Sequence, residues 1–138
     1  MLNQDRDNTI ENTARGQAKM QLAGVIEMVK ELRAACSEGD EKRIEKAEKV
    51  IEEDPVEVCV RSGWQPVGNT SSPEIDEYSI LLCGGGPAVS VTGNLNAHGT
   101  PDDAKLEYRD WFERWTEYET TEEEKEYLVE YADQFYYE

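Results

Sequence analysis

The sequence predicts an α+β fold in a single domain: a helical section over residues 1–54, an antiparallel sheet of about four strands over 55–110, and an acidic aromatic segment ending in a helix over 111–138. Three observations predict it. Apolar residues recur at helical spacing near both ends of the chain and alternate with a period of two in the middle, and the links between the alternating stretches are too short for crossover helices. A chain of 138 residues suits one domain with a modest core.

The first 54 residues are predicted to form a helical hairpin or one long kinked helix. Gly39 is suited to the left-handed cap of a first helix, Asp40 caps a second over 41–53, and Pro55 ends it. Apolar or small side chains share one stripe of the first helix, predicted over 9–36: Ala18, Leu22, Val25, Val29, Leu32 and Cys36. This stripe is also a short heptad seam. Self-association as a homodimer is therefore expected to use Leu22, Val25, Val29 and Leu32.

Strands are predicted over 56–61, 77–83, 88–92 and 104–109, where side chains alternate or form short apolar runs between turn-forming residues. In the first strand Val56, Val58 and Val60 form the inward face. The loop 62–73 is rich in Gly, Pro, Ser and Thr, with Trp64 as its expected anchor. The glycines at 84–86 lie between two strands rather than before a helix, which favours a hairpin turn over a phosphate-binding loop.

The C-terminal helix is predicted to begin at a capping box formed by Thr121 and Glu124. Apolar and aromatic side chains then recur at helical spacing, which predicts packing on the sheet: Tyr127, Leu128, Tyr131, Ala132 and Phe135.

The charge balance argues against direct binding to nucleic acid. Asp and Glu number 31 against 14 Lys and Arg, so the formal net charge is -17, and such a surface repels phosphates. A partner with a basic surface is the expected counterpart. More than half of the excess lies in residues 101–138, which hold 14 acidic and 4 basic residues.

Neither a signal peptide nor a membrane span is expected from the sequence. The three cysteines are widely spaced, so neither a disulfide framework nor a zinc site is expected, and reduced thiols in the cytoplasm are the default.

Catalytic motifs are weak. The single histidine, His98, lies in a turn, and a pairing with Cys83 stays open on sequence grounds. The acidic residues match no calcium-binding loop. A non-enzymatic protein without metal or cofactor is therefore expected.

An aromatic cluster at 111–118 is interleaved with acids, and three interpretations stay open. Its rings could cap the sheet edge, form an exposed contact surface with a charged rim, or stack a nucleotide base beside Arg61, Lys105, Arg109 and Arg114. The acids of the same region are spaced at i and i+4 on a helix, or at i and i+2 on a strand, about 6 to 7 Å apart, which resembles the spacing of DNA phosphates. The predicted partner-binding residues are Trp111, Glu113, Trp115, Glu117, Tyr118, Glu119, Glu122, Glu123, Glu124, Glu126 and Glu130.

The chain resembles, in character, the small acidic anti-restriction and anti-CRISPR inhibitors of phages and mobile elements. The segments RSGW at 61–64, DWFERWTEY at 110–118 and EYADQFYYE at 130–138 also look like uncharacterised phage proteins. The resemblance implies a non-enzymatic inhibitor in the host cytoplasm. Its acidic surface would occupy the basic DNA channel of a defence nuclease or CRISPR effector and block DNA binding. The alternatives are a small-molecule sponge for a nucleotide signal and a structural dimerising module.

Overall fold

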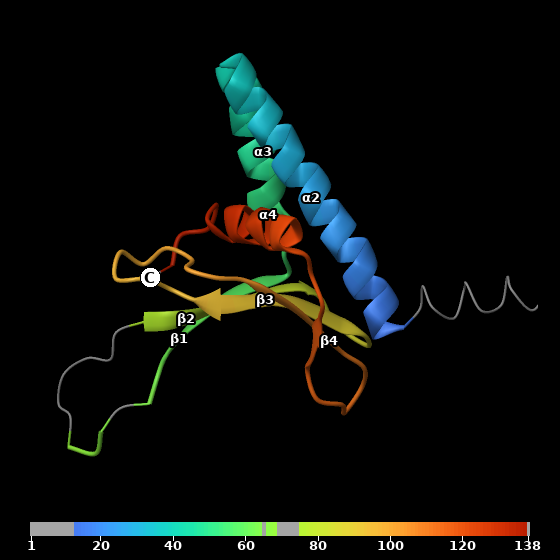
Figure 1. The fold of residues 1–138 in the computed structure, drawn as a ribbon, viewed down its shortest axis with the longest axis vertical. Coiled ribbons are helices and arrows are strands. Elements are labelled where there is room, and N and C mark those ends of the chain that lie inside the picture. The colour runs from blue at the N-terminus through green and yellow to red at the C-terminus, as the bar shows by residue number, and fades with distance from the viewer. Residues whose placement is uncertain (1–12, 65, 69–74, 138) are drawn as a thin grey trace, which may run out of the picture.

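A computed structural model describes residues 13–64, 66–68 and 75–137 of the protein (Figure 1). The helices are α2 (Ala14–Glu38), α3 (Glu41–Glu53) and α4 (Glu122–Ala132). The strands are β1 (Glu57–Ser62), β2 (Ile75–Cys83), β3 (Ala88–Asn94), β4 (Lys105–Arg109) and β5 (Thr116–Tyr118). The predicted α+β class is confirmed, with helices first, then an antiparallel sheet, then a C-terminal helix.

The helix ends follow the predicted caps. Gly39 adopts φ +69° after α2, and the Asp40 side chain accepts from the N–H of Arg43. At α4 the Thr121 hydroxyl accepts from the N–H of Glu124, whose carboxylate accepts from the N–H of Thr121. Thr13 caps α2, so the helix begins at Ala14 within the described residues; the part of the predicted helix at 9–12 lies outside them.

The five strands pair only with their neighbours in the chain, in the order β1-β2-β3-β4-β5, and every pair is antiparallel. The sheet is thus the predicted meander with one more strand. β5 was missed because it has only three residues and no hydrophobic alternation. The glycine turn is confirmed: it joins β2 to β3, and Gly85 adopts φ +91°.

Helices α2 and α4 cover one face of the sheet, and the other face carries no helix among the described residues (Figure 1). Ile80, Val91 and Leu106 lie in one row across β2, β3 and β4 and are completely buried under the helices. The α2–α3 hairpin extends beyond the sheet, so only part of α2 covers it (Figure 1).

The predicted self-association seam lies inside this core. Leu22, Val25, Val29 and Leu32 are at most 6% exposed and belong to one cluster with the sheet and α4. The fold therefore buries the side chains that the dimer prediction assigned to a second helix. The heptad spacing arose because a helix that covers a sheet needs the same apolar stripe as a coiled coil.

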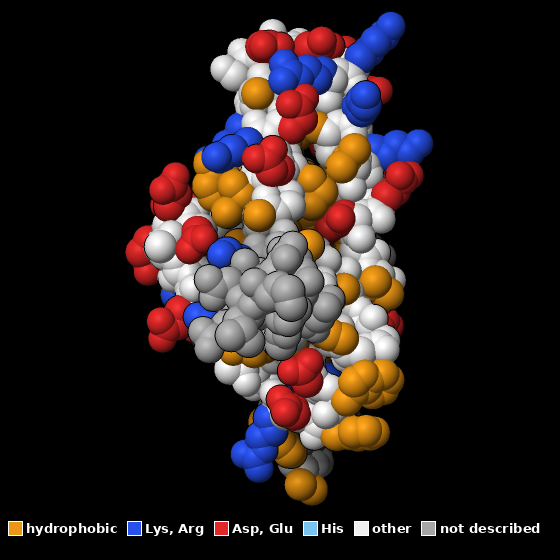
Figure 2. Space-filling model, turned by 90° about the vertical axis from the view of Figure 1, so that its right-hand side faces the viewer, with side chains coloured by type: hydrophobic (Ala, Val, Ile, Leu, Met, Phe, Trp, Pro, Cys, Tyr) orange, Lys and Arg blue, Asp and Glu red, His pale blue; other side chains and the backbone are white. Residues whose placement is uncertain are grey.

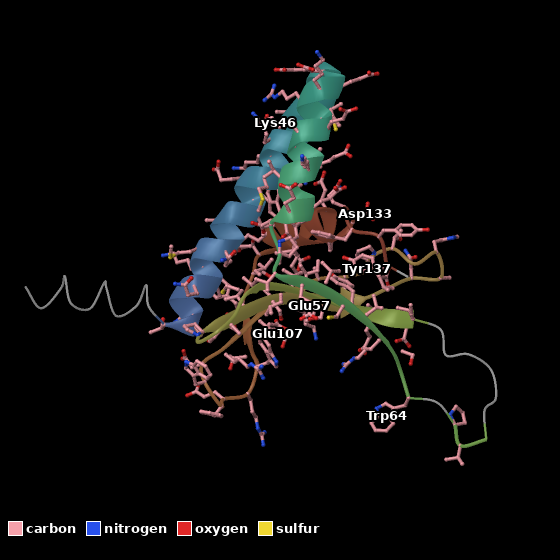
Figure 3. The ribbon with its side chains drawn as sticks, turned by 180° about the vertical axis from the view of Figure 1, so that it is seen from behind. Lys46, Glu57, Trp64, Glu107, Asp133 and Tyr137 are labelled. Carbon is pink, nitrogen blue, oxygen red and sulfur yellow. The ribbon has the colours of Figure 1, made fainter. Side chains whose placement is uncertain are left out.

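Two predictions about the first strand and the following loop are wrong. Val56 and Val58 are exposed, and only Val60 packs against the core, because α2 and α4 pack over β3 and β4 rather than over the edge strand. Trp64 is fully exposed and anchors nothing in the described part of the loop (Figure 3). No helix in the described ranges is long and apolar enough to cross a membrane.

Candidate functional site

Six exposed acids follow one another along the chain from the β4–β5 loop into α4. We call them the acidic edge: Glu113, Glu117, Glu119, Glu122, Glu123 and Glu126. The ion pairs between described residues use Glu31, Glu38, Glu53, Glu77 and Glu130, and none of these six. Over residues 113–126 there are seven acids and only two bases. The acidic edge is therefore a locally uncompensated negative surface at the β5 end of the sheet.

Three of the predicted contact residues have roles within the fold. Glu124 closes the capping box of α4. Glu130 accepts from Arg33 of α2 at 2.7 Å, and this carboxylate raises the pKa of the Arg33 guanidinium. Tyr118 is half-buried, with its ring edge-on to Tyr108 at 6.5 Å. We therefore leave these three out of the acidic edge.

The remaining predicted residues are distributed on two sides of the sheet. Glu117 lies opposite Glu107 of β4, on the face without helices, whereas Glu122, Glu123 and Glu126 belong to the helix on the covered face. In Figure 1 the loop after β4 reaches below the sheet while α4 lies above it. The surface predicted as one patch thus bends around strand β5.

The aromatic tip is the loop between β4 and β5, with Trp111, Phe112 and Trp115. Trp111 is 64% exposed and rests against the glycine turn, its Nε1 3.2 Å from the point where a Cβ on Gly86 would lie. Trp115 lies under the guanidinium of Arg109, 4.6 Å from the ring centroid. Figure 2, which faces this side of the molecule, shows hydrophobic side chains at its lower end with acidic side chains close by. Of the open interpretations, exposure of Trp111 favours a contact surface.

Phe112 is the unusual residue of the tip, and sequence reasoning did not single it out. It has φ +61°, the only positive φ at a non-glycine residue in the described chain, and its side chain is fully exposed. It occupies the third position of a turn in which the N–H of Glu113 donates to the carbonyl of Asp110, at 3.2 Å. Positive φ at that position favours Gly or Asn. A bulky ring there costs conformational energy without burying area within the protein.

Replacing Phe112 tests this strain. Phe112→Gly is expected to be about 1 kcal/mol more stable than Phe112→Ala, because only glycine adopts this φ without steric cost. Urea unfolding of both variants and the parent measures the difference. Equal stability of the glycine and alanine variants would show that the turn is not strained.

A polar groove of about 410 Å³ lies on the uncovered face of the sheet. Hydroxyls, charged groups and the ring of Trp115 line the groove. The polar lining includes Arg61, Glu77, Ser79, Ser90, Thr92, Lys105 and Glu107. The Thr92 hydroxyl donates to Glu107 at 2.6 Å, and Arg61 pairs with Glu77. The groove brings Arg61, Lys105 and Trp115 together, as the nucleotide-stacking interpretation requires.

The groove also contains Cys59, but its environment is unsuited to a nucleophile. A hydrogen bond with the Glu57 carboxylate raises the pKa of the Cys59 thiol, which disfavours the thiolate that would react.

The sequence left a catalytic pairing of Cys83 with His98 open. The structure separates them. Cys83 ends β2 at the glycine turn, opposite Val89 near the start of β3, whereas His98 follows the far end of β3. In the described ranges no three His, Cys, Asp or Glu residues are arranged to hold a metal ion.

Fold and site define a small acidic α+β protein whose sheet ends in an uncompensated acidic edge beside an exposed aromatic loop. No family model matches the chain, and no similar protein was found among curated proteins or solved structures.

Proposed function

We propose that the protein is a non-enzymatic inhibitor of a defence nuclease or CRISPR effector, whose basic nucleic-acid channel it occupies with the acidic edge and the aromatic tip. The observation that carries the proposal is the tip itself. Phe112 is held fully exposed in a strained conformation, beside an exposed Trp111 and six carboxylates without ion pairs among the described residues. No burial of the Phe112 ring within the described protein offsets this strain. Strained residues of this kind are typical of binding segments.

The spacing of the acids suits a phosphate-binding channel. Glu122 and Glu126 are one helical turn apart, which places such side chains about 6 Å from each other. Glu117 belongs to β5 and Glu119 follows its last residue, and side chains at i and i+2 along a strand are about 6 to 7 Å apart. A basic channel that binds successive phosphates would meet carboxylates at comparable intervals. Long-range attraction would accelerate association, and the affinity would fall as salt increases.

The aromatic tip would supply the part of the affinity that salt does not screen. Exposed Trp and Phe rings that become desolvated dominate the energetics of many interfaces, and a charged rim around them excludes wrong partners. Because the acids bend around β5, the protein would insert this edge into a channel rather than lie flat on a surface.

Charge reversal tests the proposal without disturbing the cap of α4. A triple variant carries Glu122→Lys, Glu123→Lys and Glu126→Lys. Its matched control carries Glu41→Lys, Glu45→Lys and Glu52→Lys on α3, three exposed acids with the same total charge change. Host proteins are captured on the parent at low and high salt, and the captured nuclease is then purified. Its binding to a labelled target duplex is followed by fluorescence anisotropy. We expect about a hundredfold weaker inhibition by the α4 variant and little change with the α3 control.

Two results would contradict the proposal: undiminished inhibition by a folded α4 variant, or an equal loss in the α3 control, which would mean that total charge alone matters. Circular dichroism of both variants establishes that they are folded.

A second candidate function, a sponge for a nucleotide signal, is favoured by the groove that joins Arg61, Lys105 and Trp115. Its test is to incubate the protein with host extract, heat it, and identify released small molecules by mass spectrometry. A nucleotide released from the parent but not from Lys105→Ala/Trp115→Ala would support this function over the first.

A further inference from the structure

Among the described residues, strand β1 leaves one edge of the sheet open. It is six residues long, twice the length of β5 at the other edge, and β2 is the only described strand that pairs with it. Figure 3 shows β1 along the near edge of the sheet, with no other strand in front of it. Val56 and Val58 are exposed beside this edge. An open edge with exposed apolar side chains is a template for another strand.

The residues of β1 are self-complementary around Cys59. If a second β1 lies antiparallel with Cys59 opposite Cys59, then Val58 faces Val60, and Glu57 faces Arg61. In this register the numbers of two residues that lie opposite each other differ by zero, two or four. The backbone N–H and C=O groups that point away from β2 on one copy therefore meet the same set of groups on the other copy. Directly opposite side chains lie on the same face, with Cβ atoms about 5 Å apart.

We propose that a second copy of this chain pairs with β1 across a two-fold axis at Cys59 and joins the two sheets into one. On the uncovered face, Arg61 would then lie between Glu77 of its own chain, with which it already pairs, and Glu57 of the second copy. Glu57 has no ion pair within the described part of the chain. On the helix face the contact covers Val58, which the fold leaves exposed.

The charges at this edge also explain why a second copy is favoured over an arbitrary strand. Charged side chains on an edge strand oppose indiscriminate pairing. In the two-fold register, however, Glu57 of each copy meets Arg61 of the other, whereas a shift by two residues would place Cys59 opposite one of these charged side chains and lose both charge pairs. The dimer leaves the acidic edge free, because β1 and β5 are the two edge strands on opposite sides of the sheet. The dimer proposal can therefore be tested independently of the proposed inhibition.

Mixing two charge variants tests the register. Glu57→Arg gives a strand with two arginines, and Arg61→Glu gives a strand with two glutamates, so each variant opposes like charges in its own homodimer. We expect each homodimer to dissociate at a concentration about tenfold higher than the parent. An equal mixture should restore dimers, because both cross-strand pairs become opposite in charge. Sedimentation velocity over a concentration series measures all four samples.

A cross-link tests the position of the axis. In the two-fold register the Cys59 Cα atoms would be about 4.5 or 5.5 Å apart, within the range for a disulfide. Cys36→Ser/Cys83→Ser keeps only Cys59; diamide takes up the two thiol hydrogens as the Sγ–Sγ bond forms. We expect a dimer on a non-reducing gel that Cys59→Ser abolishes. A parent that stays monomeric up to millimolar concentration would overturn the proposal, as would dimers in which the charge variants do not complement each other.

Discussion

Gly93→Ala is expected to destabilise the protein by about 3 kcal/mol, because β3 and the β3–β4 connection approach each other at this glycine. A Cβ on Gly93 would lie 2.2 Å from the backbone oxygen of Asp103 and 2.8 Å from Cε1 of Tyr78. Neither neighbour is free to move. The Tyr78 hydroxyl donates to that same oxygen at 2.6 Å, and the N–H of Asn94 donates to the Asp103 carboxylate at 2.7 Å. Relief of the clash would therefore break buried or cross-strand contacts.

Gly24→Ala provides the matched control, since it adds the same methyl group elsewhere. Gly24 lies within α2, and apart from its chain neighbours and the backbone of its own helix turn no described atom would lie within 4 Å of the added Cβ. There the substitution is expected to stabilise the protein by about 0.5–1 kcal/mol, because alanine favours a helix interior over glycine. Urea unfolding midpoints should move in opposite directions. A shift of both variants in one direction would contradict the packing assigned to Gly93.

Helix boundaries were predictable because their signals are local. Gly39, Asp40 and the Thr121–Glu124 box act on the backbone within three or four residues, and each adopts the predicted geometry. Strands β2, β3 and β4 were predictable from their apolar pattern. The three polar residues of β5 gave no such signal, because β5 joins the sheet through its backbone pairing to β4.

Coverage of a face was not predictable from alternation. The valines of β1 and the residues of β3 show comparable patterns, yet Val91 is completely buried and Val56 is exposed. The difference depends on where α2 and α4 lie over the sheet, which is a long-range property. The α2 stripe is buried against the sheet and α4 for the same reason, since spacing does not reveal whether a sheet or a second helix meets it.

The candidate site was predictable in composition but not in shape. The acids and tryptophans of 111–126 are visible in the sequence as a cluster. Their distribution around β5, the internal roles of Glu124 and Glu130, and the groove on the other face depend on the strand order. The positive φ of Phe112 had no signal at all, because sequence preference at that position favours glycine or asparagine.

Alkaline pH is expected to unfold the protein steeply, because the hydroxyls of three tyrosines, Tyr78, Tyr131 and Tyr137, are withdrawn from water in or against its core. Burial raises the pKa of Tyr131 and of Tyr78 well above the ordinary value, and for Tyr131 a hydrogen bond to the Asp54 carboxylate adds to the shift. Burial raises the pKa of Tyr137 as well. The folded protein therefore keeps all three protons at pH values where the unfolded chain loses them. Stability is unaffected below the unfolded pKa of about 10 and falls above it, by about 4 kcal/mol per pH unit for the three groups.

Two phenylalanine variants separate this effect from general alkaline denaturation. Tyr131→Phe removes one buried ionisable group, so the slope above pH 10 should fall by about 1.4 kcal/mol per pH unit. At neutral pH it should cost about 1 kcal/mol, because the 2.7 Å hydrogen bond to Asp54 is lost. Tyr136→Phe, at an 85% exposed position, should change neither value. Urea unfolding at stepped pH measures the slopes, and tyrosinate absorbance reports ionisation directly. If Tyr131→Phe and the parent lost stability at the same rate, the Tyr131 hydroxyl would have to ionise within the folded protein, and the buried hydrogen bond to Asp54 would not exist in solution.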